Sequence, residues 1–313
     1  MAEAKRLEFG IAIPQIFSTP PVDALLLQRF LARAEALGYH SVWVQEQILG
    51  SASTLEPVTL LTFAAALTRR LRLGSAVLLT PLRSPVQLAK SLSTLDHLSG
   101  GRLIAGIGLG GNTRIYPAFG LSAEHRVRRF VEGIRLMKRL WTEERVTFEG
   151  QFWTLQNASM EPKPVQKPHP PVWFGGHHDA ALKRTAELGD GWIGAGSSTP
   201  AQFREEVQKL SGYLAEAGRD PSEFPLAKRI YIAVDRDKAR AGKRLEEWSG
   251  RYYRNAELAP RVAVYGAERE CTDKLAEIIS AGATLPILNP VFDEMDHLDL
   301  LAEAVVPALR AGR

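Results

Sequence analysis

The sequence alternates short runs of β-type composition with longer segments of helical periodicity. The first run covers residues 9–13, and in the helix that follows, Leu26, Phe30, Ala34 and Leu37 recur at helical spacing. Seven further runs cover residues 41–44, 71–79, 102–107, 172–174, 191–193, 229–234 and 285–288, each followed by a helical pattern. Such alternation predicts an α/β protein with a parallel sheet and helices outside it. Eight pairs favour closure into a (β/α)₈ TIM barrel over an open doubly wound sheet.

Two segments interrupt the alternation. Residues 146–155 have strand composition around a Glu149–Gly150 turn, and five prolines follow between residues 162 and 171. We interpret this part as an inserted hairpin and an extended strap over the barrel. Residues 237–282 hold more helix than one crossover needs. The sequence therefore predicts a single domain, residues 1–313, with insertions at about 142–171 after the fourth helix and 237–282 after the seventh strand.

Composition narrows the class of protein. Hydrophobic residues make up 45% of the chain and charged residues 24%, as in ordinary globular proteins. We expect no membrane association and a cytoplasmic location, because no apolar run approaches about 20 residues and the first ten residues lack a signal-peptide core. The single cysteine, Cys271, excludes an intramolecular disulfide. The formal charge of +4 is dispersed along helices, so we interpret the basic residues as solvated helix faces and do not expect nucleic acid as a partner. Attraction of a phosphorylated small molecule is the second interpretation.

Residues just past each strand of such a barrel line its active face, and here they are rich in glycine and amide. Residues 106–112 (GIGLGGN) follow the fourth strand, and their missing side chains would let a planar ligand approach the backbone. Residues 175–178 (GGHH) open a helix, and residues 194–198 (GAGSS) precede another, where free amides suit phosphate. No spacing of metal ligands is present, so we expect no metal site.

Several candidate residues admit two interpretations. Glu46, directly past the second strand, is either a base or cofactor anchor, or a carboxylate paired with an arginine such as Arg83. His177 and His178 are proton donors, phosphate contacts or plain loop residues, and their place at a helix start favours contact with an anion. Trp43 lies inside a strand, which favours packing over a role as a substrate platform.

The combination of motifs resembles the luciferase-like family of flavin and deazaflavin oxidoreductases. It is carried by residues 9–11 (FGI), 34–39 (AEALGY), 42–46 (VWVQE), 73–77 (LGSAV), 95–102 (LDHLSGGR) and 187–192 (ELGDGW). The resemblance implies a (β/α)₈ barrel with the cofactor ring over the carboxyl ends of the strands. It also implies a non-proline cis peptide bond near Ala76–Val77.

The resemblance also bears on the cofactor. Flavin mononucleotide (FMN) members often carry an arginine in the loop after the fourth strand, where this chain has Leu109. That difference favours the deazaflavin coenzyme F420, with FMN as the alternative. In F420 members an Asp-His pair corresponds to Glu46–Gln47, and some have a glutamate at the position of Gly111. Gln47 cannot exchange a proton as histidine does, so proton transfer would come from Glu46, a histidine on another loop, substrate or water.

These arguments give a defined set of expected site residues. The expected catalytic residues are Glu46, Gln47 and His177. The expected cofactor-binding residues are Glu46, Ala76, Val77, Thr80, Gly108, Gly110, Asn112, Gly175, Gly176, His177 and His178.

The expected function is an F420-dependent oxidoreductase that transfers hydride to or from a small organic substrate held under the strap. One alternative is an FMN-dependent monooxygenase that activates oxygen with reduced flavin. Another is a non-catalytic flavin-binding protein, which the departures at Gln47 and Gly111 would also suit. The apolar helices at residues 55–67 and 88–98 predict a homodimer interface, or alternatively only the cover of the barrel.

Overall fold

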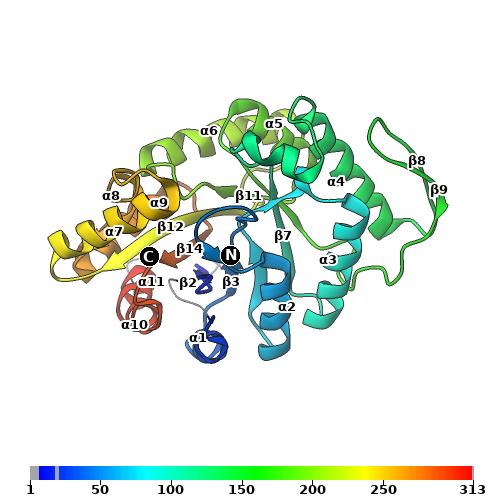
Figure 1. Cartoon of the computed structure of the whole chain (residues 1–313). Coiled ribbons are helices and arrows are strands. Elements are labelled where there is room, and N and C mark those ends of the chain that lie inside the picture. Colours follow the sequence, from blue (N-terminus) through cyan, green and yellow to red (C-terminus); the bar gives the residue numbers. More distant parts are fainter. Residues whose placement is uncertain (1–6, 18–20, 312–313) are drawn as a thin grey trace.

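Eight parallel strands close into a barrel in the computed structural model, which describes residues 7–17 and 21–311. In order around the ring the strands are β1 (Gly10–Ala12), β3 (Ser41–Val44), β5 (Arg72–Ser75), β7 (Leu103–Gly108), β10 (Val172–Gly175), β11 (Gly191–Gly194), β12 (Leu226–Val234) and β14 (Leu285–Pro290). The ring closes because β14 pairs with β1 and β7 pairs with β10. The predicted TIM barrel is confirmed (Figure 1).

Helices surround this ring. They are α1 (Ala24–Ala36), α2 (Pro57–Leu67), α3 (Pro85–Ser99), α4 (Arg126–Thr142), α5 (Asp179–Leu188), α6 (Pro200–Glu216), α9 (Glu268–Ser280), α10 (Glu294–Leu300) and α11 (Val306–Ala311). Their starts follow local chemistry: the side chains of Asp23, Ser84 and Thr199 each accept a hydrogen bond from a first-turn amide. Helix α3 ends at Gly100, which adopts the left-handed conformation with φ of 67°.

The third strand differs from the predicted continuous run over 71–79. It is divided into β5 and the short β6 (Leu78–Leu79), which are joined by the cis peptide bond Ala76–Val77. The cis bond that the family resemblance implied is therefore confirmed. The Ser75 hydroxyl donates to the Gly106 carbonyl at 2.8 Å and accepts from the Gly106 amide at 3.0 Å, so β5 ends in side-chain contacts rather than in a backbone ladder.

The predicted seventh strand, 229–234, begins too late. Strand β12 starts at Leu226, because residues 226–228 pair with β11 on one side and 227–228 with β14 on the other. Lys228 interrupts the apolar run but is buried, with its side chain directed outward from the barrel toward Ser198. A charged residue in a strand position thus concealed the true boundary.

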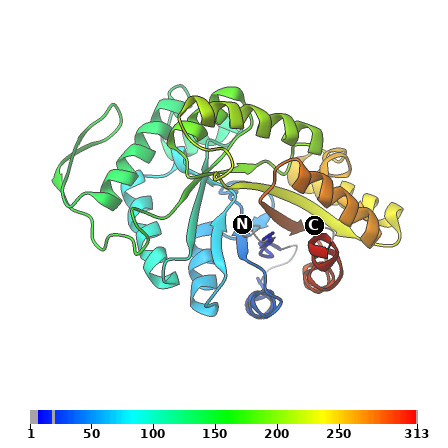
Figure 2. The ribbon, with the colours of Figure 1, turned by 180° about the vertical axis from the view of Figure 1, so that it is seen from behind.

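The first insertion contains the predicted hairpin, formed by β8 (Val146–Glu149) and β9 (Thr154–Ala158). The hairpin projects beyond α4, on the opposite side of the molecule from α7 and α8 (Figures 1 and 2). In the strap, the side-chain nitrogen Nε2 of Gln166 donates to the Leu103 carbonyl at the start of β7 and to Asp96 Oδ1 near the end of α3. The strap therefore lies at the amino ends of the strands, and its predicted position over the substrate is wrong.

The second insertion adds α7 (Lys238–Tyr253), α8 (Leu258–Val262) and β13 (Val264–Gly266) before α9. Strand β13 pairs with the last residues of β12, from Ile232 to Val234. This pairing holds α7 beside the carboxyl end of the barrel, which is the end where such folds carry their active sites.

Two tryptophans fill the barrel interior. Trp43 and Trp173 have ring centroids 5.8 Å apart and pack among Ile104, Ile193 and Ile287. Glycines on neighbouring strands make room for them: a Cβ atom at Gly74 would lie 2.4 Å from the Trp43 ring. Trp43 is therefore packed inside the barrel, and it also lines the floor of a cavity at the carboxyl ends of the strands.

The surface of α2 and α3 does not test the predicted homodimer, which stays a prediction. The inner faces of α2 and α3 are buried against the barrel, and the largest exposed apolar side chains on them are Leu98, 58% exposed, and Leu67, 39% exposed. Within the described residues, no helix has the length and apolar character needed to cross a membrane.

We expect Gly106→Ala to destabilise the fold strongly, because a Cβ atom there would lie 1.7 Å from the Ser75 carbonyl oxygen. Backbone must move to relieve that contact, at a cost of at least about 3 kcal/mol in the free energy of unfolding. Gly111→Ala is the matched control, because no described atom lies within 4 Å of its Cβ position. Urea unfolding of both variants measures the difference, and equal stabilities would contradict the packing argument.

Candidate active site

A cavity of about 890 Å³ opens at the carboxyl ends of β1, β3, β12 and β14. Its floor is the barrel interior, with Trp43, Ala76 and Ile287. One wall comes from α7, with Trp248 and Tyr252, and another from the paired strands β2 (Ile16–Phe17) and β4 (Ser53–Thr54). The volume lies within the range of small-molecule sites.

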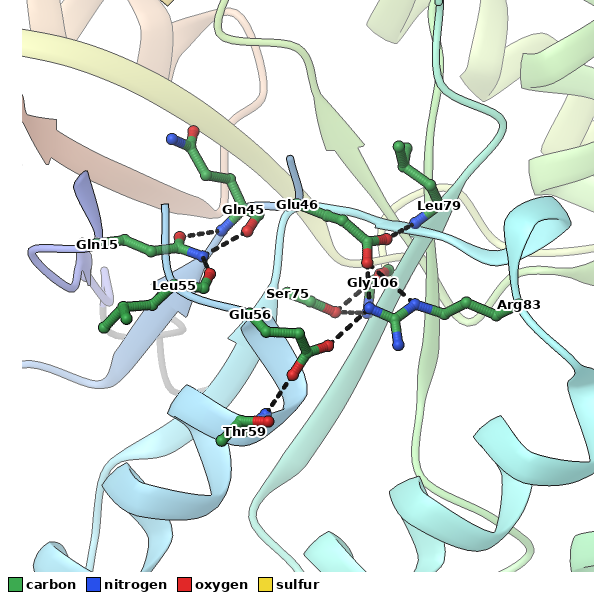
Figure 3. Close-up of polar contacts among 10 residues, drawn as sticks. All are labelled: Gln15, Gln45, Glu46, Leu55, Glu56, Thr59, Ser75, Leu79, Arg83 and Gly106. Carbon is green, nitrogen blue, oxygen red and sulfur yellow. Dashed lines mark hydrogen bonds and ion pairs between the residues drawn. The ribbon is translucent and has the colours of Figure 1, made fainter. Parts of the chain in front are cut away.

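A set of amide side chains and one arginine forms the polar part of the cavity. Gln15 and Gln45 fix each other: the Gln45 amide donates to Gln15 Oε1 at 2.8 Å, and Gln15 Nε2 donates to the Gln45 carbonyl at 2.7 Å (Figure 3). Arg229 Nε donates to Asn289 Oδ1 at 2.8 Å, and Arg229 Nη2 donates to Gln45 Oε1. Residues of β12 and β14 thus form one hydrogen-bonded group with residues that follow β1 and β3.

The sequence analysis missed Arg229. The signal was the alternation along β12: Ala227 and Tyr231 are buried on the same side as Arg229, whereas Lys228 points the opposite way. An arginine on the inward side of a closed barrel faces the cavity and not the outer surface.

Five of the expected cofactor-binding residues form a contiguous floor next to this cavity. Ala76 and Val77 follow β5, Thr80 follows β6, and Gly108 and Gly175 end the adjacent strands β7 and β10. A Cβ atom at Gly108 would lie 2.6 Å from Val77, and one at Gly175 would lie 2.9 Å from it. Because neither glycine has a side chain, the half-buried Val77 side chain fits into the space beside them. The apolar surface above Val77 is therefore low. The Thr80 hydroxyl is buried without a hydrogen-bond partner among the described residues.

The other expected cofactor-binding residues lie at the rim. Gly110 and Asn112 are exposed, and Asn112 Oδ1 accepts from the Arg114 amide at 3.1 Å, which caps the short helix at Thr113–Phe119. His177 and His178 are exposed, with ring centroids 4.3 Å apart. Partial burial and the neighbouring His178 lower the pKa of His177 below its ordinary value of 6.5, so the ring is neutral at pH 7.

The start of α5 offers free backbone donors beside these histidines. The amides of residues 177–180 donate to no other described residue, and His178 at the N-cap position makes no side-chain capping bond. Gly176 precedes them with φ of 147°, and a Cβ atom there would lie 2.8 Å from Ala181. Asp179 in the first turn pairs with Lys209 at 2.9 Å. A helix start with unbonded amides is suited to an anion.

Glu46 forms the ion pair that was the second interpretation of the sequence. Its side chain is fully buried; Oε2 accepts from the Leu79 amide, and Oε1 accepts from Arg83 (Figure 3). Arg83 also contacts Glu56, 2.7 Å away. With both oxygens occupied, the Glu46 carboxylate fixes the backbone that follows the cis bond, which favours a positioning role.

Of the expected site residues, only Ala76 lines the cavity. Gln47 is half-buried near β4, where Thr54 Oγ1 donates to Gln47 Oε1 at 3.2 Å. The expected site residues therefore fall mainly into three groups: the floor around Val77, the start of α5, and the contacts of Glu46. The cavity adjoins these groups at Ala76.

The loop after the fourth barrel strand has basic neighbours that its own sequence lacks. Leu109 packs against the core, and its carbonyl accepts from the Tyr116 hydroxyl at 3.5 Å. Arg126 and Arg129 of α4 lie near Tyr116 and lower its pKa, although burial raises that pKa more. Each has a buried Nε atom without a partner among the described residues. Leu109 alone therefore does not decide between F420 and FMN.

The glycine-rich loop at residues 194–198 is held in place by contacts with Lys228 of β12. Lys228 Nζ donates to the Ser198 hydroxyl at 2.7 Å and to the Ser198 carbonyl at 3.0 Å. Burial lowers the pKa of Lys228 to about 7 and raises that of nearby Glu206 to about 7. These contacts give the loop a fixed conformation without any ligand.

Comparison with known proteins places the chain among a group of related sequences. Residues 7–285 match the sequence profile described as luciferase-like monooxygenase. An F420-dependent glucose-6-phosphate dehydrogenase of Kineococcus radiotolerans is 31% identical over 71% of this chain and 68% of its own length. An FMNH(2)-dependent dimethylsulfone monooxygenase of Pseudomonas putida is 33% identical over 54% of this chain and 47% of its own length. An uncharacterised protein of Mycobacterium tuberculosis is 39% identical, and the match spans 53% of this chain and 58% of that protein.

Solved structures share the barrel over nearly the whole chain. An F420-dependent secondary alcohol dehydrogenase in complex with an F420-acetone adduct superposes with a TM-score of 0.85 at 21% identity, covering 97% of this chain and 99% of that one. The monooxygenase RslO1 of Streptomyces bottropensis superposes with a TM-score of 0.84 at 26% identity, covering 96% and 99%.

We expect Glu46→Gln to reduce the free energy of unfolding by about 3 kcal/mol, because the new amide group would direct a donor at Arg83 or at the Leu79 amide. Glu56→Gln is the control, since Glu56 is 43% exposed and shares the same arginine; its cost is about 1 kcal/mol or less. Urea unfolding measures both. Equal small effects would show that the Glu46 pair is dispensable for the fold.

Proposed function

Because the chain belongs to the luciferase-like monooxygenase family, we propose that it is an oxidoreductase that uses coenzyme F420 to transfer hydride to or from a small organic substrate. The supporting observation is the extent of the match: the F420-dependent dehydrogenase aligns over 71% of the chain, against 54% for the FMNH(2)-dependent monooxygenase. The second candidate, an FMN-dependent monooxygenase, is favoured by Arg126 and Arg129 beside the loop at Leu109.

The residues present suit a flavin-type cofactor. The low surface over Val77, bordered by Gly108 and Gly175, would support a planar ring, and the free amides of residues 177–180 would hold its phosphate. Gly110 and Asn112 would border the ring from the loop after β7. When bound, the cofactor supplies the hydride chemistry, and the protein supplies orientation and electrostatics.

The chain's own residues have separate roles in this proposal. Glu46 holds the Leu79 amide and Arg83, and so positions the floor. Gln47 orients Thr54 and β4 at the cavity wall. His177 is the expected catalytic residue with a proton to exchange, since its lowered pKa leaves a neutral ring that can accept or donate at pH 7. Substrate lies in the cavity next to Ala76, between α7 and the β2–β4 pair.

The cytoplasmic location and the homodimer are part of the proposal. The exposed Leu67 and Leu98 side chains on α2 and α3 support a dimer contact.

We expect F420 to bind the purified chain with micromolar or tighter affinity and FMN to bind at least a hundredfold more weakly. Titration calorimetry with each cofactor measures this. Tight FMN binding without F420 binding would contradict the proposal and support the second candidate, an FMN-dependent monooxygenase. Binding of F420 without turnover across a broad panel of alcohols, aldehydes and enones would instead support a non-catalytic protein.

The phosphate position is tested at Asp179, because a side chain at Gly176 would itself distort the backbone. Proline at the first helical position removes the Asp179 amide but preserves the helix. Asp179→Ala is the matched control, because it loses the same carboxylate and the same contact with Lys209. We expect Asp179→Pro to bind the cofactor about tenfold more weakly than Asp179→Ala, the scale of one hydrogen bond to a charged group. Equal affinities would place the phosphate away from α5.

A further inference from the structure

Arg229 brings a positive charge into the depth of the cavity without a balancing negative charge. It forms no ion pair with any described carboxylate, whereas Arg33, Arg83, Arg139, Arg240 and Arg244 each do. Its neighbours are the neutral amides of Gln45 and Asn289, and its guanidinium lies 5.0 Å from the centre of the Tyr231 ring. Arg229 is half-buried, and charges withdrawn from bulk solvent are usually paired in proteins, so an unpaired one that faces a cavity points to an anionic ligand.

The contacts of Arg229 also fix its direction. Nε and Nη2 each donate to one amide oxygen, and Nη1 donates to no described residue. Those amides are themselves held: the Gln45 backbone is bonded to Gln15, and Asn289 Nδ2 donates to the Pro290 carbonyl at 2.9 Å. The free edge of the guanidinium is therefore a pre-oriented donor, the geometry that binds a carboxylate well.

The other charged residues that line the cavity belong to α7 and to the start of α10. Arg244 pairs with Asp293, and Glu247 and Arg251 are exposed on α7. Glu294 also lines the cavity, and burial raises the pKa of its carboxyl group. A single positive charge at depth matches a singly charged anion better than a doubly charged phosphate.

Aromatic side chains form the wall that faces Arg229. Trp248 and Tyr252 stack with ring centroids 5.5 Å apart and an interplanar angle of 8°, and both line the cavity. Phe292 lines it as well and is fixed by Arg244, which lies 3.8 Å from the centre of its ring. This wall provides flat apolar surface for an aromatic or other planar ring.

We propose that the substrate is an organic acid with a planar ring, whose carboxylate binds Arg229 and whose ring packs against Trp248 and Tyr252. This rests on the proposed function, because the acid is taken as the substrate of that hydride transfer. The carboxylate would anchor the molecule at the β12–β14 side of the cavity and direct its other end toward Ala76.

The test uses two probes of equal shape, 2-naphthoate and its neutral amide 2-naphthamide, titrated into the full-length chain without cofactor. Omitting the cofactor separates this test from the proposed function: absent F420 binding would not alter it. We expect naphthoate to bind at least tenfold more tightly than naphthamide. Arg229→Met should abolish that preference and keep naphthamide affinity within about threefold, whereas Arg251→Met, at the exposed rim, should retain it. Equal binding of the two probes, no binding of either, or an unchanged preference in Arg229→Met would overturn the proposal.

A chemical measurement on the unmodified sequence covers the case in which Arg229→Met does not fold. Phenylglyoxal modifies accessible arginines, and peptide mass spectrometry follows each site separately. Naphthoate should slow modification of Arg229 at least fivefold and leave Arg251 unchanged, and naphthamide at the same concentration should protect neither. Equal modification of Arg229 with and without naphthoate would place the acid elsewhere and overturn the proposal.

Discussion

The exchange of hydrogen bonds between the Ser75 side chain and the Gly106 backbone determines where the site forms. It ends β5 one residue before the cis bond, because the Ser75 hydroxyl occupies both backbone groups of the neighbouring strand. Ala76 then reaches the cavity, and Val77 lies over the space left by Gly108 and Gly175. Leu79 meets Glu46 two residues later. The positions of the floor, the cavity and the Glu46–Arg83 ion pair therefore all follow from the point at which β5 ends.

Glu46 and Arg229, two charged side chains near this end of the barrel, differ in how their charges are compensated. Both oxygens of Glu46 already accept hydrogen bonds, one from a backbone amide and the other from Arg83. Arg229 is held by neutral amides that fix its direction but leave its charge uncompensated. A satisfied buried ion stabilises the chain's own conformation. An oriented but unpaired one costs free energy to keep, and an anionic ligand would offset that cost.

The sequence predicted the barrel because period and composition act locally: eight apolar runs, serine and proline at the start of α3, and glycine at its end. It failed where a residue's role depends on distant partners. Lys228 concealed the start of β12 because its contacts with Ser198 come from another strand-helix loop. The strap crosses the amino ends of the strands because Gln166 bonds to Leu103 and Asp96. The sequence analysis interpreted Gly108 as room for a planar ligand and Gly175 as part of an anion site, and only the fold shows that Val77 lies beside both.

The division of the site follows the division of the chain. The floor comes from β5, β7 and β10, all strands of the closed ring, and its shape depends on contacts between neighbouring strands. The opposite wall comes from α7, which lies in the insertion after β12 and contacts both β12 of the ring and β13 of the insertion. Changes in α7 at Trp248 or Tyr252 can therefore alter the cavity wall and leave the Ser75–Gly106 contact untouched. Arg229 belongs to the ring but faces the insertion, so charge selection is fixed by the barrel and shape selection by the inserted helix.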